Sequence, residues 1–142
     1  MIEWYKKVVF ENYSNFKGRA RRSEYWYFAL ANGLISVLLL ALGAIIGGLL
    51  GDVPTGLIIG YALFLGLYVP ATFLPGLAVI VRRLHDVGKS GWFYFIAFIP
   101  FIGAIWILIL FCTEGTQGPN QYGPDPKNDI EDINEIGKVE LQ

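Results

Sequence analysis

The chain has 142 residues, of which 54% are hydrophobic and only 16% are charged. A soluble domain carries about 25% charged residues, so this composition excludes a disordered chain and disfavours an ordinary soluble one. Eleven basic and twelve acidic residues give a net charge of −1, which disfavours nucleic-acid binding. One cysteine and one histidine exclude an intrachain disulfide, a cysteine-based zinc cluster and a histidine-pair metal motif.

Residues 1–22 predict an amphipathic helix followed by a basic loop. Apolar and charged residues recur at helical spacing on opposite faces (Ile2, Tyr5, Val9, Tyr13 and Phe16 against Glu3, Lys7 and Glu11). Such a helix beside a membrane span is expected to lie in the headgroup plane, where Trp4 and Tyr5 are well suited. The alternative is an ordinary helix that packs on the rest of the protein.

Three long stretches contain no charged residue: 27 residues over 25–51, 29 over 53–81 and 24 over 90–113. Each exceeds the ~20 apolar residues that cross a bilayer as a helix. We therefore predict an all-α, polytopic membrane protein with three spans near 25–50, 57–81 and 92–112, within one membrane domain of residues 1–127. The alternative is a soluble helical protein, but buried helices rarely run this long without a charge.

Glycines recur every four residues near the end of the first predicted span, at Gly43, Gly47 and Gly51, and again at Gly56 and Gly60. Small residues on one face allow two helices to approach closely. The loop between these spans is very short, so we expect a packed hairpin with these glycines at the helix contact.

Prolines interrupt the later spans, at Pro70 and Pro75 in the second and at Pro100 in the third. Each removes a helical hydrogen bond and favours a kink. Broken membrane helices can mark transport sites, which makes a small transporter or channel component, acting as an oligomer, the second functional hypothesis. Pro100 also leaves open a model in which 92–112 is a re-entrant hairpin.

The end of the chain is polar. Residues 113–126 are rich in glycine and proline and predict turns, whereas residues 128–142 are acidic and predict disorder. Lysine and arginine concentrate in the first 22 residues and between the second and third spans. The positive-inside rule therefore places the N-terminus and the 82–90 loop in the cytoplasm. Three full spans would place the tail outside, and a re-entrant hairpin would return it to the cytoplasm.

The densest polar cluster joins two basic segments on the same predicted side of the membrane. Its members are Arg19, Arg21, Arg22, Arg82, Arg83, His85, Asp86 and Lys89. Guanidinium groups bind phosphate in a bidentate manner, and basic pockets between helices hold anionic lipid headgroups. The main hypothesis is a non-enzymatic protein that binds an anionic headgroup or an acidic segment of a partner here. The alternative is that these residues only set the membrane topology.

A membrane enzyme with His85 and Asp86 as an acid–base pair is the third hypothesis. No nucleophile motif or metal motif accompanies these two residues, so we expect no catalytic residue, no metal and no cofactor. The expected partners are membrane lipids, with other membrane proteins or a second copy of the chain as further alternatives. No nucleic-acid partner is expected.

Several motifs occur in an order that is similar to a known family. They are Phe16-Lys17-Gly18-Arg19-Ala20-Arg21-Arg22-Ser23-Glu24-Tyr25-Trp26, Arg82-Arg83-Leu84-His85-Asp86, Ser90-Gly91-Trp92, Ile99-Pro100-Phe101-Ile102-Gly103, Gly115-Thr116-Gln117-Gly118-Pro119-Asn120 and Tyr122-Gly123-Pro124-Asp125-Pro126. Over residues 1–127 the chain resembles the DUF805 family of small bacterial inner-membrane proteins. The resemblance implies a location in the bacterial inner membrane and supplies no activity.

Overall fold

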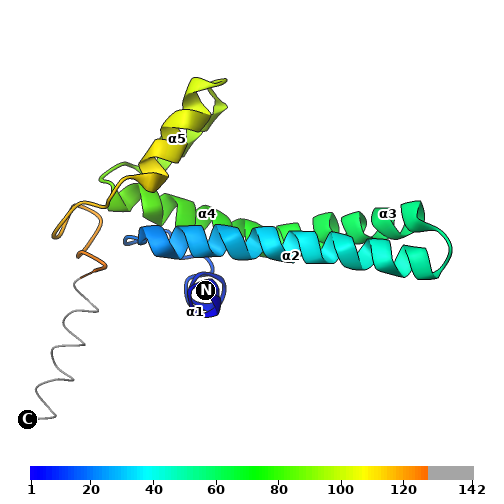
Figure 1. The fold of residues 1–142 in the computed structure, drawn as a ribbon. Coiled ribbons are helices and arrows are strands. Elements are labelled where there is room, and N and C mark those ends of the chain that lie inside the picture. The colour runs from blue at the N-terminus through cyan, green and yellow to red at the C-terminus, as the bar shows by residue number, and fades with distance from the viewer. Residues whose placement is uncertain (128–142) are drawn as a thin grey trace, which may run out of the picture. The chain divides into compact units, whose positions relative to one another are not determined.

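The computed structural model describes residues 1–127, and these residues contain helices and no β-strand (Figure 1). The elements in chain order are α1 (Ile2–Lys6), η1 (Lys7–Glu11), α2 (Arg22–Leu49), α3 (Val53–Leu63), η2 (Phe64–Tyr68), α4 (Val69–Asp86), η3 (Gly91–Phe98) and α5 (Ile102–Cys112). The all-helical prediction is therefore confirmed for this part of the chain. The acidic tail over 128–142 lies outside the described residues.

The described residues form two compact units. The first contains residues 1–14 and 26–76, and the second contains residues 15–25 and 77–127. Most of α2, all of α3 and the start of α4 belong to the first unit. The end of α4, η3, α5 and the polar loop after α5 belong to the second.

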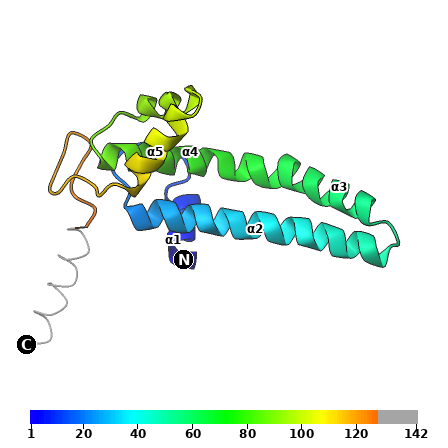
Figure 2. The ribbon, with the colours of Figure 1, turned by 45° about the horizontal axis from the view of Figure 1, so that its top comes forward.

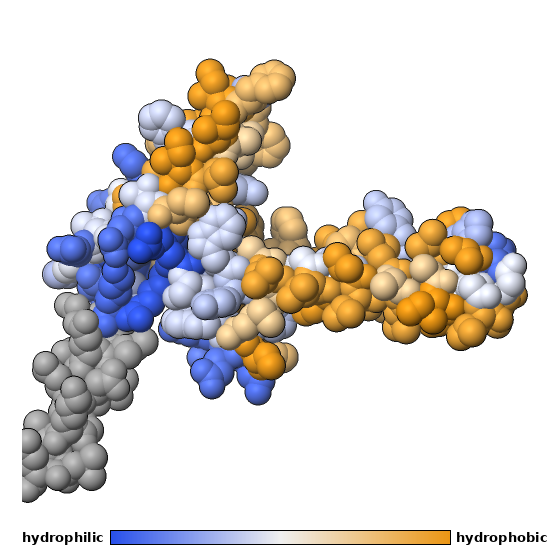
Figure 3. Space-filling model, in the orientation of Figure 1, coloured by the Kyte–Doolittle hydropathy of each residue, from blue (hydrophilic) through white to orange (hydrophobic). Residues whose placement is uncertain are grey.

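Two helical stretches are long and apolar enough to cross a membrane: α2, and the continuous run Val53–Asp86 made of α3, η2 and α4. Only 6% of the most apolar part of each is buried, so neither is the core helix of a soluble fold. Apolar side chains make up most of the face of the α2–α3 hairpin that Figure 3 shows. These stretches correspond to the first two predicted spans.

The turn between α2 and α3 is built from local hydrogen bonds. Gly51 has a φ of +81°, a conformation that favours glycine, and the Asp52 amide donates to the Gly47 carbonyl at 2.8 Å. The Asp52 carboxylate then caps α3, accepting from the Thr55 amide at 3.3 Å and from its hydroxyl at 2.5 Å. The chain therefore reverses within a few residues, and α2 and α3 lie side by side (Figure 2).

Glycines line the contact between α2 and α3. A Cβ atom added at Gly43 would lie 2.7 Å from the Gly56 carbonyl oxygen and 3.0 Å from Gly60 Cα. At Gly47 it would lie 2.6 Å from the Asp52 carbonyl oxygen and 2.8 Å from Gly56 Cα. No larger side chain fits at these positions without separating the backbones. Gly51 is in the turn and takes no part in this contact.

The N-terminal helices are short. Within the first unit, the Tyr5 ring stacks on Phe28 with centroids 5.7 Å apart, and the Tyr5 hydroxyl lies 3.5 Å from that of Tyr68. Tyr68, at the end of the π-helix η2, donates to Asn32 Oδ1 at 2.5 Å. These contacts attach α1 to the long helices of this unit. The location of α1 in a headgroup plane remains a prediction.

The region of the third predicted span is not one continuous helix. Residues 92–112 contain the 3₁₀-helix η3 and the α-helix α5, separated by a turn in which Phe101 has a φ of +63°. Each helix is about 16 Å long, roughly half of a ~30 Å hydrocarbon core. Gly103 lies directly against the η3 backbone at Ile96 and Ala97, so the two helices pack as a hairpin. Pro100 interrupts the helical hydrogen bonds at this turn.

The second unit has a small apolar core. Leu84 of α4 packs with Ile107 and Phe111 of α5, and all three are buried. The Tyr25 ring contacts Phe111 with centroids 4.4 Å apart. This core fixes the end of α4 beside α5, and it supports the polar cluster described below.

Candidate functional site

Three segments that are distant in sequence meet in the second unit: residues 15–25, the end of α4, and the loop after α5. Backbone hydrogen bonds connect them, from the Ala20 amide to the Arg82 carbonyl at 3.0 Å and from the Thr116 amide to the Asp86 carbonyl at 2.8 Å. The Asn120 side-chain amide also donates to the His85 carbonyl at 3.0 Å. The end of α4 is therefore hydrogen-bonded both to residues 15–25 and to the loop after α5.

Asp86 is the centre of the polar cluster. Its Oδ1 lies 3.0 Å from both Nε and Nη2 of Arg19, and its Oδ2 pairs with Nη1 of Arg83. All three side chains are buried, with 5% or less of each exposed. The carboxylate therefore neutralises two guanidinium groups away from solvent, an arrangement that is stable only when hydrogen bonds satisfy the remaining donors.

Backbone carbonyls satisfy those donors. Arg19 donates to the carbonyls of Thr116 and, at 2.6 Å, Gly118. Arg83 donates to the carbonyls of Thr113, Leu110 and Phe111, the last two at 3.4 Å. The two arginines thus attach α5 and the following loop to α4. At Gly115 any Cβ atom would collide with the Asp86 carboxylate.

A second buried ion pair joins the start of α2 to α4. Arg82 Nη1 lies 2.7 Å from Glu24 Oε1, and 4% and 2% of the two side chains are exposed. Sequence reasoning missed Glu24, because its position at the edge of an apolar stretch looked like a simple boundary charge. Because a buried basic residue needs a counter-ion, the need for a carboxylate partner was the signal that could have identified Glu24.

His85 and Asp86 do not contact each other in a catalytic arrangement. The His85 Nδ1 atom lies 3.1 Å from the Gly18 carbonyl oxygen, and its ring stacks on Tyr122 with centroids 3.9 Å apart and an angle of 3°. Asp86 accepts from arginines instead. Lys89 is exposed, with its Nζ 5.5 Å from the centre of the Phe93 ring.

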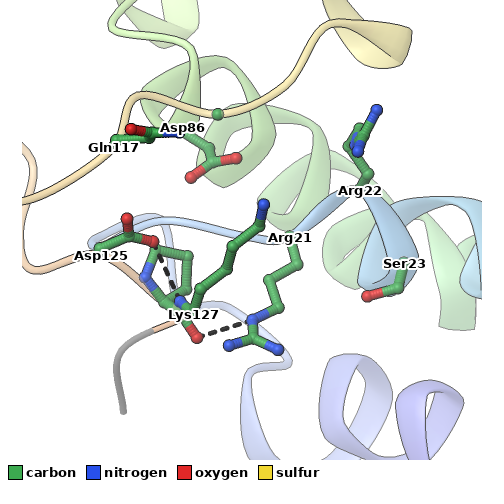
Figure 4. A pocket seen from close by; sticks show the side chains of 9 residues that line it. Arg21, Arg22, Ser23, Asp86, Gln117, Asp125 and Lys127 are labelled. Atoms are coloured by element: carbon green, nitrogen blue, oxygen red, sulfur yellow. Dashed lines mark hydrogen bonds between the residues drawn. The ribbon is translucent and has the colours of Figure 1, made fainter. Parts of the chain in front are cut away.

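The remaining predicted arginines line an open pocket of about 200 Å³ (Figure 4). We call it the basic pocket. Its lining residues are Arg21, Arg22, Ser23, Asp86, Gly115, Gln117, Asp125, Pro126 and Lys127. Arg21 Nε donates to the Pro126 carbonyl at 2.6 Å, which leaves its Nη1 and Nη2 atoms without a hydrogen-bond partner among residues 1–127.

Acidic residues around the basic pocket are all engaged. Arg22 and Lys127 both pair with Glu114, whose pKa is held below its usual value mainly by the hydrogen bond from Lys127. A hydrogen bond from the Lys127 amide likewise lowers the pKa of Asp125. Among the described residues, three basic side chains (Arg21, Arg22 and Lys127) and two acidic ones (Asp86 and Asp125) line the basic pocket, so positive charge is in excess in its lining.

Two long, exposed apolar helical stretches are typical of a helical membrane protein. The profile of the family described as "Protein of unknown function (DUF805)" matches residues 13–124, and the chain belongs to this family. The resemblance predicted from the motifs is therefore confirmed.

The chain is similar to curated proteins of Escherichia coli strain K12. It is 44% identical to "Inner membrane protein YhaI" over 126 residues, which cover 89% of this chain and 97% of that protein. It is 41% identical to "Inner membrane protein YhaH", with 89% and 98% covered. "Uncharacterized protein YiiR" is 28% identical over 80% of this chain and 87% of the relative. No solved structure matches the chain.

Proposed function

We propose that this protein is a non-enzymatic, lipid-binding membrane protein that holds the phosphate of an anionic lipid in the basic pocket. The observation that carries the proposal is the set of three basic side chains, Arg21, Arg22 and Lys127, around one pocket at the start of an apolar helix. Guanidinium and ammonium groups bind phosphate through charge-assisted hydrogen bonds.

The proposal divides the predicted cluster into two roles. Arg19, Arg82 and Arg83 are buried and paired with carboxylates, so they do not bind the phosphate. Arg19 and Arg83 hold the loop after α5 in place, and Arg82 joins α4 to the start of α2. Arg21 and Arg22 remain accessible, and Lys127, which sequence reasoning left out, joins them. His85 and Lys89 do not line the basic pocket.

Replacing Arg21 by Gln should weaken binding of phosphatidylglycerol about tenfold, because a hydrogen bond to a charged group contributes ~1.5–3 kcal/mol. The measurement is the occupancy of co-purified phosphatidylglycerol by native mass spectrometry, titrated against phosphatidylethanolamine. Lys89→Gln is the matched control, since it removes one exposed positive charge outside the pocket. Equal occupancy in R21Q and K89Q would contradict the proposal.

Replacing Glu114 by Gln should strengthen the same binding several-fold, because Arg22 and Lys127 lose a competing carboxylate. The pKa of Glu114 is lowered, mainly by Lys127, so this carboxylate is ionised at neutral pH and is lost only as the pH falls through that lowered value. Wild-type binding should therefore be constant from pH 6 to 8. Exposed Glu11→Gln is the control and should leave the affinity unchanged.

We also propose a topology with two full spans and a re-entrant η3–α5 hairpin, with the N-terminus in the cytoplasm. Arg19 donates to carbonyls of the loop after α5, and hydrogen-bonded segments share one side of a membrane. This favours the hairpin over three full spans. Reporter fusions after Lys89 and Asn128 should both be cytoplasmic, and a fusion after Gly51 periplasmic. A periplasmic signal after Asn128 would restore the three-span arrangement.

A further inference from the structure

We propose that a second pocket in the same unit binds a lipid-soluble aromatic alcohol of the hydroquinone class, with His85 accepting its hydroxyl hydrogen. The pocket is distinct from the basic pocket, and no lining residue is common to both. Its volume is about 550 Å³, within the range of ~300–1,000 Å³ that is typical of small-molecule sites. We call it the aromatic pocket, after its ring-bearing residues Phe16, His85, Trp92, Tyr94 and Phe95.

The walls of the aromatic pocket favour a flat, uncharged ligand. Trp92 and Phe95 stack on each other with centroids 5.7 Å apart and an angle of 19°, which presents aromatic faces in series. A planar ring adds to such a surface by offset or edge-to-face contact. Among residues 1–127, no lysine or arginine lines the pocket, so a phosphate or carboxylate headgroup would lose its hydration without gaining a counter-ion.

His85 gives the pocket a directional acceptor. The Gly18 carbonyl oxygen 3.1 Å from Nδ1 can only accept, so Nδ1 carries the hydrogen and Nε2 of the neutral imidazole is an acceptor. Tyr122 covers one face of the ring and fixes its orientation. Nε2 has no hydrogen-bond partner within the described part of the chain. A ligand that donates a hydroxyl hydrogen would satisfy it.

Ser90 supplies the complementary donor. Its hydroxyl oxygen accepts from the Trp92 amide at 3.4 Å, which leaves the hydroxyl hydrogen for a ligand oxygen. An aromatic hydroxyl both donates and accepts, so the hydroquinone class offers a donor for His85 and an acceptor for Ser90, which both line the pocket. Trp92 and Phe95 are 79% and 56% exposed, so a ligand dissolved in the bilayer can reach the pocket.

The single histidine makes a direct test possible. The full-length protein, with ¹⁵N-labelled histidine and in phosphatidylcholine nanodiscs, is titrated with decylhydroquinone under reducing conditions and, separately, with its dimethyl ether. We expect the hydroquinone to shift the Nε2 resonance saturably and the ether, which has no hydroxyl hydrogen, to leave it unchanged. An unchanged resonance with hydroquinone, or equal shifts with both compounds, would overturn the proposal.

Two variants separate pocket binding from general partition into the lipid. Trp92→Ala removes an exposed wall residue and should weaken hydroquinone binding about fivefold, as expected for loss of one aromatic contact. Trp106→Ala, at an exposed residue of α5 outside the pocket, should leave the affinity unchanged. Equal affinities in W92A and W106A, with circular dichroism spectra that match wild type, would also overturn it. Neither variant alters the basic pocket, so the outcome is independent of the lipid proposal.

Discussion

Asp86→Asn should destabilise the second unit by about 3–5 kcal/mol, the largest effect expected for a single substitution in this chain. The amide keeps the size of the side chain but removes the negative charge that both Arg19 and Arg83 contact. Both guanidinium groups would then be buried without a counter-ion. The measurement is the thermal unfolding midpoint in detergent, followed by far-ultraviolet circular dichroism, together with the yield of monodisperse protein.

The matched control for this prediction is Glu114→Gln. It makes the same chemical change at a carboxylate that also pairs with two basic residues, but at an exposed position. Exposed ion pairs contribute little to stability, so E114Q should unfold close to wild type. If D86N and E114Q unfold together, the Asp86 cluster is solvated and does not hold the loop to α4.

Gly56→Ala should destabilise the α2–α3 hairpin by about 1–3 kcal/mol, the usual cost of an extra methyl group in a packed contact. A Cβ atom at this position would collide with the backbone of α2 at Gly43 and Gly47. Backbone atoms cannot move aside as a flexible side chain can. The expected result is a lower midpoint of unfolding in a sodium dodecyl sulfate titration of the detergent-solubilised protein.

Gly33→Ala is the control for the hairpin prediction. Gly33 is also in α2, but a Cβ atom there would meet nothing within 4 Å. Alanine is a better helix former than glycine by ~1 kcal/mol, so G33A should be neutral or slightly stabilising. A G56A protein as stable as G33A would mean that the helices are not in contact at these glycines.

The amino-acid sequence by itself determined the class of protein. The long uncharged stretches predict apolar helices because a charge in hydrocarbon is costly, and that rule acts on each stretch independently of the others. The family resemblance likewise rests on short motifs that can be read in order. The short loop at Asp52 also predicts the α2–α3 hairpin, because neighbouring helices that are joined by few residues pack together.

Only the tertiary structure decided which charges are available. The five candidate arginines look alike in the sequence, yet Arg19 and Arg83 are neutralised by Asp86 and Arg82 by Glu24, while Arg21 and Arg22 line a pocket with Lys127. Asp86 lies 67 residues from Arg19 along the chain, and the Pro126 carbonyl lies 105 residues from Arg21. The availability of a charge depends on burial and on contacts between distant segments, and neither leaves a local pattern. The tertiary structure also decided that residues 92–112 form two helices. A hydropathy pattern does not show where the backbone turns, whereas the packing of Gly103 against η3 shows that the chain reverses there.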